Sequence, residues 1–153
     1  MQAKEIMTRD PACCTPDSRA EEAARLMSEH DCGAIPVVDG EGSHHLVGVV
    51  TDRDIALRGV AQGRGPGTPV SEIMTAGPEC CSEKDDVHDV EDVMKRNQVR
   101  RVPIIDAKGE LVGIISQADL ARSEGDQISD AEVGQVVERI SEPHRGVRSA
   151  QAD

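Results

Sequence analysis

The chain has 153 residues and a formal net charge of −12, and its 37% hydrophobic residues include no Phe, Tyr or Trp. This length fits one compact domain with a core of aliphatic side chains and Met. The acidic charge argues against a nucleic-acid partner, because phosphate backbones favour Lys and Arg. The lack of aromatic rings argues the same way, because single-strand binders stack bases on such rings.

No run of about 18 apolar residues and no signal-like N-terminal pattern occur, so the sequence predicts no membrane association and a cytoplasmic location. Four of the five cysteines form the adjacent pairs Cys13-Cys14 and Cys80-Cys81. Adjacent cysteines make poor disulfides and cannot easily ligate one tetrahedral metal together, so we predict reduced thiols and no metal site. We expect one thiol of each pair to point inward as a small hydrophobe. A thiol-based redox or stress sensor is the alternative.

The chain contains an internal repeat. Ile6 and Ile73 both open an Ile-Met-Thr segment, and Pro36 and Pro103 both lie in an apolar-Pro-apolar-apolar-Asp segment, with 67 residues between the members of each pair. Residues 48–51 match residues 113–116 at a separation of 65. This register indicates a tandem duplication and predicts a two-fold-related body with paired equivalent sites. Because each copy alone is small, we expect the copies to share one interior.

In chain order, the first copy begins with a short strand and continues with a helix. Asp17-Ser18 can cap this helix, in which Ala20, Ala23, Ala24 and Met27 follow helical spacing. The apolar runs 35–38 and 46–50 flank a Gly-containing turn and predict a hairpin. A second helix is predicted to start at Thr51.

The second copy follows a linker over residues 63–69 that is rich in Gly and Pro. It repeats the same order, with an acidic helix start at Asp85-Asp86 and a second helix that starts at Ser116. A capping box then opens a predicted amphipathic C-terminal helix, and a disordered tail follows. The predicted divisions are repeat 1 (1–62), linker (63–69), repeat 2 (70–123), C-terminal helix (124–141) and tail (142–153).

This pattern resembles the tandem cystathionine-β-synthase (CBS) domain pair, or Bateman module, over roughly residues 1–123. The chain is also similar to small stand-alone CBS-pair proteins of hypoxic-response type, which carry a comparable Thr-Asp-Arg-Asp-Ile stretch. The resemblance implies an α/β fold, in which two β-α-β-β-α repeats pack as one pseudo-two-fold module, and it implies a homodimer. It also implies regulatory binding of an adenosine nucleotide, with AMP as the first candidate and ATP, ADP or S-adenosylmethionine as alternatives.

The two Thr/Ser-x-x-Asp segments give this binding a physical basis. Thr51 and Ser116 each end a strand and cap a helix, and Asp54 and Asp119 follow three residues later. A carboxylate accepts two hydrogen bonds, the number that vicinal ribose hydroxyls donate, and a helix N-terminus favours an anion. The same residues also fit a capping box that closes a helix without any ligand. Both interpretations remain open at this point.

The resemblance pairs the hydroxyl and carboxylate of one repeat with the opening segment and pre-proline strand of the other. Site A then consists of Thr51, Arg53, Asp54, Thr75, Pro78, Cys80, Val99, Arg100, Arg101 and Val102. Site B consists of Thr8, Pro11, Cys13, Cys32, Ala34, Ile35, Ser116 and Asp119. Arg53 and Arg101 of site A are matched by Ala118 and Ala34 in the second site. We therefore predict that site A prefers a phosphorylated adenosine, unless Arg101 is only a solvated charge at a strand edge.

No nucleophile–base arrangement and no glycine-rich phosphate loop of the Walker type occur in the sequence. We therefore predict that the protein is not an enzyme. The alternative to a ligand-binding sensor is a dimeric interaction module whose pockets no longer bind a ligand.

Overall fold

The computed structural model describes residues 1–40 and 42–123. The first repeat contains α1 (Ala3–Ile6), β1 (Thr8–Arg9), α2 (Ala20–His30), β2 (Ala34–Gly40), β3 (Ser43–Thr51) and α3 (Asp52–Asp54), which continues as a π-helix over Ile55–Gly59 and a 3-10 turn over Val60–Gln62. A 3-10 turn over Val70–Glu72 then precedes β4 (Thr75–Ala76), β5 (Cys81–Ser82), α4 (Val87–Asn97), β6 (Arg101–Ile105), β7 (Leu111–Ser116) and α5 (Gln117–Arg122). The predicted C-terminal helix and tail lie outside the described residues.

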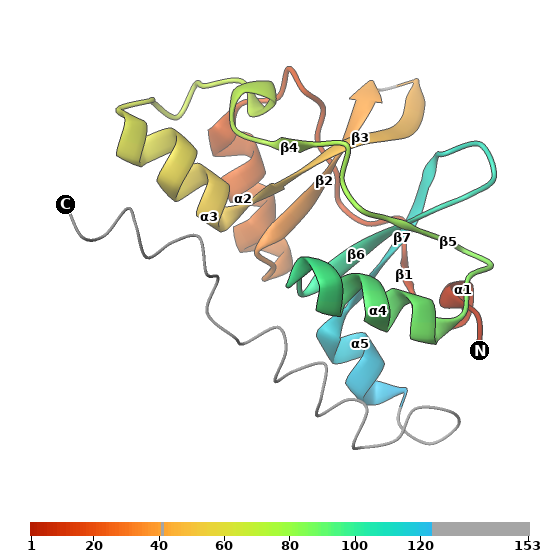
Figure 1. Ribbon diagram of the computed structural model, residues 1–153. Coiled ribbons are helices and arrows are strands. Elements are labelled where there is room, and N and C mark those ends of the chain that lie inside the picture. The colour runs from red at the N-terminus through yellow and green to blue at the C-terminus, as the bar shows by residue number, and fades with distance from the viewer. Residues whose placement is uncertain (41, 124–153) are drawn as a thin grey trace.

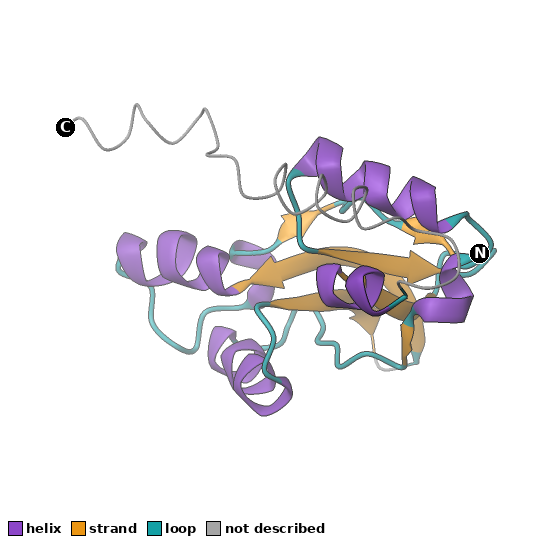
Figure 2. Cartoon of the chain, turned by 90° about the horizontal axis from the view of Figure 1, so that it is seen from below, coloured by secondary structure: helices purple, strands orange, loops and turns teal. Residues whose placement is uncertain are grey.

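The strands form two related sheets, with the orders β1-β7-β6-β5 and β2-β3-β4. An isolated parallel bridge between Cys14 and Val37 extends the second sheet beside β2. It corresponds to the parallel pairing of Cys81 with Ile104 in the first sheet. Figure 2 shows the strands gathered in the middle of the molecule, with helices around them. The predicted α/β class and its pseudo-two-fold arrangement are confirmed.

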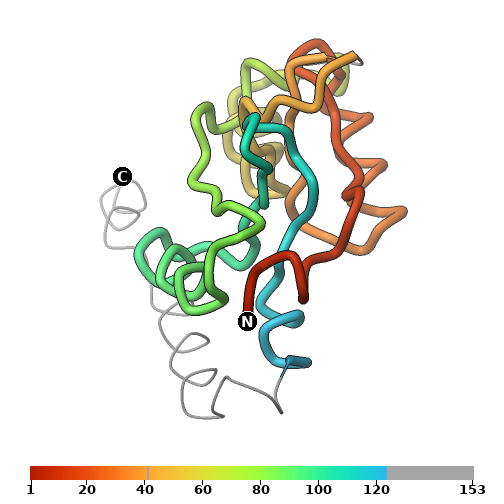
Figure 3. The backbone as a smooth tube through the Cα atoms, turned by 90° about the vertical axis from the view of Figure 1, so that its right-hand side faces the viewer, coloured from red at the N-terminus to blue at the C-terminus, as the bar shows by residue number. Residues whose placement is uncertain are grey.

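Each repeat contributes its opening segment to the sheet of the other repeat. The antiparallel pairing of β1 with β7 places Thr8 opposite Ile114, and the pairing of β4 with β3 places Thr75 opposite Val49. In Figure 1 the segment that carries β4 and β5 passes from β3 of the first repeat into the second repeat. Figure 3 shows the N-terminal trace running beside the trace of β7. The pseudo-two-fold module is therefore joined by exchanged strands.

Two glycines at equivalent positions permit this exchange. A Cβ atom at Gly48 would lie 2.8 Å from the Met74 Sδ and 2.9 Å from the Thr75 carbonyl oxygen. A Cβ atom at Gly113 would meet the Met7 side chain and lie 3.0 Å from the Thr8 carbonyl oxygen. Only a residue without a side chain allows the incoming backbone to approach this closely.

Most buried hydrophobic residues form two clusters, so the expectation of a single shared interior is wrong. The cluster around α2 includes Val70 and Ile73 of the second repeat, and the cluster around α4 includes Ala3 and Met7 of the first. The physical reason is the exchange: each sheet packs against its own long helix, and the other repeat's opening segment completes that layer. Neither repeat can fill its core alone.

The long helices begin differently from one another. The predicted cap at residues 17–18 is wrong, because the N-cap of α2 is Arg19 without a side-chain hydrogen bond; the Ser18 hydroxyl instead accepts a hydrogen bond from the Thr15 N–H. Helix α4 begins as predicted, with the Asp86 carboxylate accepting from the His88 N–H at 3.0 Å. Both helices have 11 residues. Within the described part of the chain, no helix has the length and apolar character needed to span a bilayer.

Candidate functional site

Both Thr/Ser-x-x-Asp segments form closed capping boxes at the end of a strand. The Asp54 N–H donates to Thr51 Oγ1 at 3.0 Å, and the Thr51 N–H donates to Asp54 Oδ2 at 3.0 Å. The Asp119 N–H donates to Ser116 Oγ at 3.2 Å, and the Ser116 N–H donates to Asp119 Oδ2 at 2.7 Å. The capping interpretation is confirmed. Because the cap uses Oδ2 of each carboxylate, Oδ1 remains available to other partners.

An arginine that the sequence analysis did not select contacts Oδ1 of each carboxylate. Arg122 Nη2 lies 2.6 Å from Asp119 Oδ1, and Arg58 Nε lies 3.7 Å from Asp54 Oδ1. The carboxylate side chains are only 14% exposed for Asp54 and 10% exposed for Asp119. Each arginine follows its aspartate by three or four residues, the spacing of neighbours on one helix face. This spacing is the signal that could have identified both residues.

The two carboxylates differ in how far their acceptor positions are filled. Asp119 receives the Ser116 N–H, the Ser116 hydroxyl at 2.8 Å and the short contact from Arg122. From the described residues, Asp54 receives one hydrogen bond, from the Thr51 N–H, and the longer ion pair with Arg58. Since a carboxylate offers about four lone-pair positions, Asp54 keeps more capacity for additional donors.

The opening segment of the second repeat connects Thr51 to the pre-proline strand of that repeat. Thr75 in β4 lies opposite Val49, two residues before Thr51 on β3. The same segment then reaches β5, which runs parallel to β6, and β6 begins at Arg101. The site A residues on this connecting segment are Thr75, Pro78 and Cys80.

Site B has the equivalent arrangement. Thr8 in β1 lies opposite Ile114, two residues before Ser116 on β7. The chain then reaches Cys14, which bridges to Val37 of β2. The predicted residues on this path and at the start of β2 are Thr8, Pro11, Cys13, Cys32, Ala34 and Ile35.

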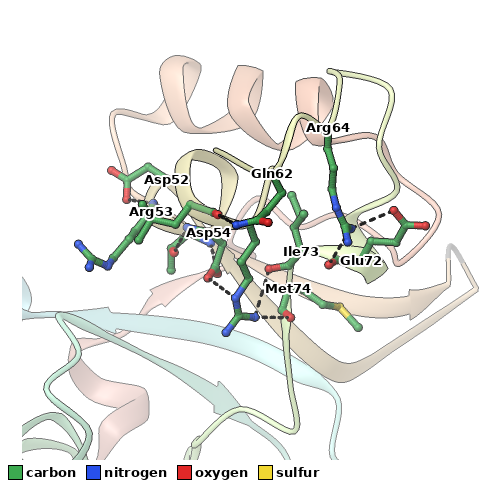
Figure 4. Close-up of polar contacts among 11 residues, drawn as sticks. Asp52, Arg53, Asp54, Gln62, Arg64, Glu72, Ile73 and Met74 are labelled. Carbon is green, nitrogen blue, oxygen red and sulfur yellow. Dashed lines mark hydrogen bonds and ion pairs between the residues drawn. The ribbon is translucent and has the colours of Figure 1, made fainter. Parts of the chain in front are cut away.

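Some predicted site residues have side chains that are poorly placed to contact a ligand. Val102 is 0% exposed and Ile35 is 1% exposed, because both belong to the core clusters, so only their backbone could contact a ligand. Val99 is 36% exposed. The exposed Arg53 points away from the contacts around Asp54 and Met74 in Figure 4.

The other two predicted arginines are positioned within their own repeat. Arg101 pairs across β6 and β7 with Ser116. The Arg100 carbonyl oxygen accepts a hydrogen bond from the Gln117 N–H at 2.9 Å. Among the described residues, Arg58 is the arginine that contacts Asp54.

Cys14 and Cys81 have the environment of small buried hydrophobes, whereas Cys13, Cys32 and Cys80 are partly exposed. Cys14 is 6% exposed and Cys81 is 4% exposed, and burial raises the pKa of each thiol to about 12. Burial also raises the pKa of Cys13 and is the largest cause of the raised pKa of Cys80. A reactive thiol requires a lowered pKa, so these four environments disfavour a thiol sensor. Over residues 1–40 and 42–123, no three His, Cys, Asp or Glu side chains are grouped to hold a metal ion.

Duplicated α/β repeats with exchanged openings and paired helix-capping carboxylates define a tandem-repeat module. A family model for the CBS domain matches residues 3–59 and 70–126, and the chain belongs to this family as a tandem pair. The CBS domain-containing protein YhcV of Bacillus subtilis is 42% identical over 138 residues, which cover 90% of this chain and 94% of YhcV. Hypoxic response protein 1 of Mycobacterium tuberculosis is 36% identical over 121 residues, 78% of this chain and 82% of that protein.

Solved structures show the same fold. Hypoxic Response Protein I with two coordinated zinc ions has a TM-score of 0.74 and 35% identity, covering 80% of this chain and 98% of its own. The CBS domain protein PAE2072 of Pyrobaculum aerophilum, complexed with AMP, has a TM-score of 0.73 and 26% identity. The match covers 90% of this chain and 99% of PAE2072. The CBS domain pair of protein MJ0100, in complex with 5-methylthioadenosine and S-adenosyl-L-methionine, has a TM-score of 0.72 and 30% identity. The match covers 82% of this chain and 100% of the MJ0100 chain.

The family also occurs within larger enzymes. Inosine-5'-monophosphate dehydrogenase of Methanocaldococcus jannaschii is 30% identical over 122 residues, but these cover only 23% of that enzyme. The match therefore concerns one part of a larger protein. YhcV and hypoxic response protein 1, in contrast, match over most of their length.

Proposed function

We propose that this chain is a non-catalytic regulatory sensor that binds an adenosine nucleotide at site A. The observation that carries the proposal is the position of Asp54, a mostly buried carboxylate at the end of β3, beside the opening segment of the other repeat and with acceptor positions left. Such a carboxylate can accept both vicinal hydroxyls of a ribose. AMP is our first candidate; ATP, ADP and S-adenosylmethionine share the same adenosine group. The adenosine ligands bound in the PAE2072 and MJ0100 complexes support this choice.

Site B is proposed to bind more weakly. A ribose there has to compete with Arg122, which already lies 2.6 Å from Asp119. Ala34 and Ala118 of this site also supply no cation for a phosphate, whereas an arginine can bind phosphate through two parallel hydrogen bonds. We therefore propose one strong nucleotide site per chain.

Titration calorimetry with AMP tests this proposal. We expect one AMP per chain, and we expect Asp54→Ala to weaken binding by about 1.5–3 kcal/mol, the scale of a hydrogen bond to a charged group. Asp119→Ala is the matched control, because it removes the equivalent cap and should leave AMP binding little changed. Each variant should also lose about 1 kcal/mol of unfolding free energy through the lost cap. Unchanged AMP affinity in Asp54→Ala, or loss of binding only in Asp119→Ala, contradicts the proposal.

A dimeric interaction module without a ligand is the second candidate function. The exposed side chains of Leu57 (47%) and Val60 (71%) favour it, because they offer an apolar contact surface on the helical stretch after Asp54. We propose a homodimer under either function. Thermal melting followed by circular dichroism separates the two, since AMP raises the melting temperature of a sensor and leaves that of a ligand-free module unchanged. The five free cysteines also support our proposal of a reducing, cytoplasmic location.

A further inference from the structure

A guanidinium joins the two repeats at site A. Arg58 Nε lies 3.7 Å from Asp54 Oδ1. Arg58 Nη1 donates to the Met74 carbonyl oxygen at 3.1 Å and lies 3.5 Å from the Ile73 carbonyl oxygen. In Figure 4 these contacts run from Asp54 to Met74. Because Ile73 and Met74 precede β4, Arg58 connects the carboxylate of the first repeat to the opening segment of the second.

The helical turn that carries Arg58 is irregular. A π-helix over Ile55–Gly59 begins directly after Asp54, and the Val60 N–H bonds to the carbonyl oxygens of Ala56 and Ile55. The equivalent helix of the second repeat is described as the α-helix α5 up to Arg122. Single π-turns within helices occur frequently at functional sites. The π-helical turn and the Arg58 guanidinium that it carries therefore both lie at site A.

The guanidinium still has donors to offer. Nε and Nη1 contact protein acceptors, and Nη2 makes no hydrogen bond to any residue in the described part of the chain. The Arg58 side chain is 53% exposed, so a ligand can reach it. An arginine has five N–H donors, and a phosphate needs two of them for a bidentate pair. A cation that is already held by two carbonyl oxygens loses less freedom when it binds a ligand.

The second repeat provides the contrast. Arg122 pairs with Asp119, but its side chain is 75% exposed and it makes no hydrogen bond to the other repeat among the described residues. Ser123 occupies the position that corresponds to Arg58, and its hydroxyl donates to the Leu120 carbonyl oxygen at 2.7 Å. Among residues 1–40 and 42–123, site B thus has no counterpart to the Arg58 guanidinium, which contacts both repeats.

We propose that Arg58 is the specificity-determining residue that makes site A prefer a phosphorylated adenosine to adenosine itself. This inference rests on the proposed function. Asp54 accepts the ribose hydroxyls, and Arg58 pairs with the phosphate oxygens through its free donors while it keeps its hydrogen bond to Met74. Phosphate recognition at site A therefore includes a direct link to the second repeat.

The test compares the affinities of AMP and adenosine by calorimetry in four proteins: the full chain, Arg58→Gln, Arg58→Lys and Arg64→Gln. The wild type should bind AMP more tightly than adenosine. Arg58→Gln should weaken AMP by about ten-fold or more and change adenosine by less than about two-fold, because only the charge-assisted phosphate pair is lost. Arg64→Gln is the matched control and should preserve the wild-type ratio, because Arg64 also contacts the second repeat, through Glu72 at 3.1 Å, but it contacts neither site carboxylate. Arg58→Lys should restore part of the preference, because it restores the charge without the bidentate geometry.

Each contrary result has a distinct meaning. If Arg58→Gln retains the wild-type ratio of affinities, Arg58 is not the phosphate contact, and the inference fails while the proposed function stands. If Arg58→Gln weakens both ligands equally, Arg58 only supports the site and the specificity role is wrong. If the wild type binds neither ligand, the proposed function fails, and this inference fails with it.

Discussion

At the scale of single residues, Asp86 shows how a helix cap responds to pH. Its carboxylate accepts the backbone N–H of His88 at 3.0 Å and lies 2.8 Å from the His88 ring Nδ1. These two bonds lower the pKa of Asp86 to about 2 from its ordinary value of 3.8. Because the pKa is lower in the folded state than in the unfolded state, ionised Asp86 stabilises the fold.

We predict that this stabilisation is present above about pH 4 and is lost as the pH falls toward 2, since the unfolded state takes up the proton first. Urea unfolding of the wild type and Asp86→Asn measures it, because asparagine keeps the cap acceptor without the charge. The wild type should be the more stable protein at about pH 6, and the difference should disappear near pH 2. A difference that does not change with pH would show that the charge has no role.

The sequence predicted some of the candidate site at this scale and missed the rest. Asp54 and Asp119 were identifiable because a carboxylate three residues after a strand-ending hydroxyl fits both a capping box and a ribose-binding position. The spacing between Asp54 and Arg58 was visible in the sequence, but the contacts of Arg58 with the backbone carbonyl oxygens of Ile73 and Met74 were not. Backbone atoms leave no mark in a sequence, and these two reach Arg58 only through the exchanged opening segment.

At the scale of elements, the close approach of β4 to β3 depends on Gly48. We predict that Gly48→Ala lowers the free energy of unfolding by about 1–3 kcal/mol, because the new methyl group displaces the backbone of β4. Gly67→Ala is the control: no atom lies within 4 Å of a Cβ at that position, so stability should be unchanged or slightly increased. Urea unfolding monitored by circular dichroism gives both values. Equal stabilities of the two variants would mean that β4 moves away at no cost.

The hairpins and the helix starts at Thr51, Asp86 and Ser116 followed from the sequence, because apolar runs and caps are local signals. The cap of α2 did not, because Ser18 bonds within its own turn to Thr15. Local spacing did not predict the strand pairing of β1 with β7 and of β4 with β3; only the resemblance grouped each opening segment with the other repeat. Such pairing between repeats depends on which sheet edge is open, and local spacing does not carry that information.

At the scale of the whole molecule, the duplication predicted the pseudo-two-fold module. The division of its interior into two clusters, in contrast, depends on the exchange of β1 and β4 between the repeats. We predict a dimer in which Leu57 and Val60 are covered, because large exposed apolar side chains gain from association. Sedimentation velocity at high micromolar concentration should show a dimer for the wild type and a monomer for the double variant Leu57→Glu, Val60→Glu. A monomeric wild type would remove the homodimer from our proposal.

The exchanged strands also determine when the protein can fold during its synthesis. Residues 8–9 pair with residues 113–114, which are synthesised about a hundred residues later. The core around α2 likewise stays open until Val70 and Ile73 have been translated. A nascent first repeat therefore exposes an unfilled apolar layer and an unpaired strand, the features that chaperones recognise in folding intermediates. The chain becomes a stable unit only after almost all of both repeats has emerged.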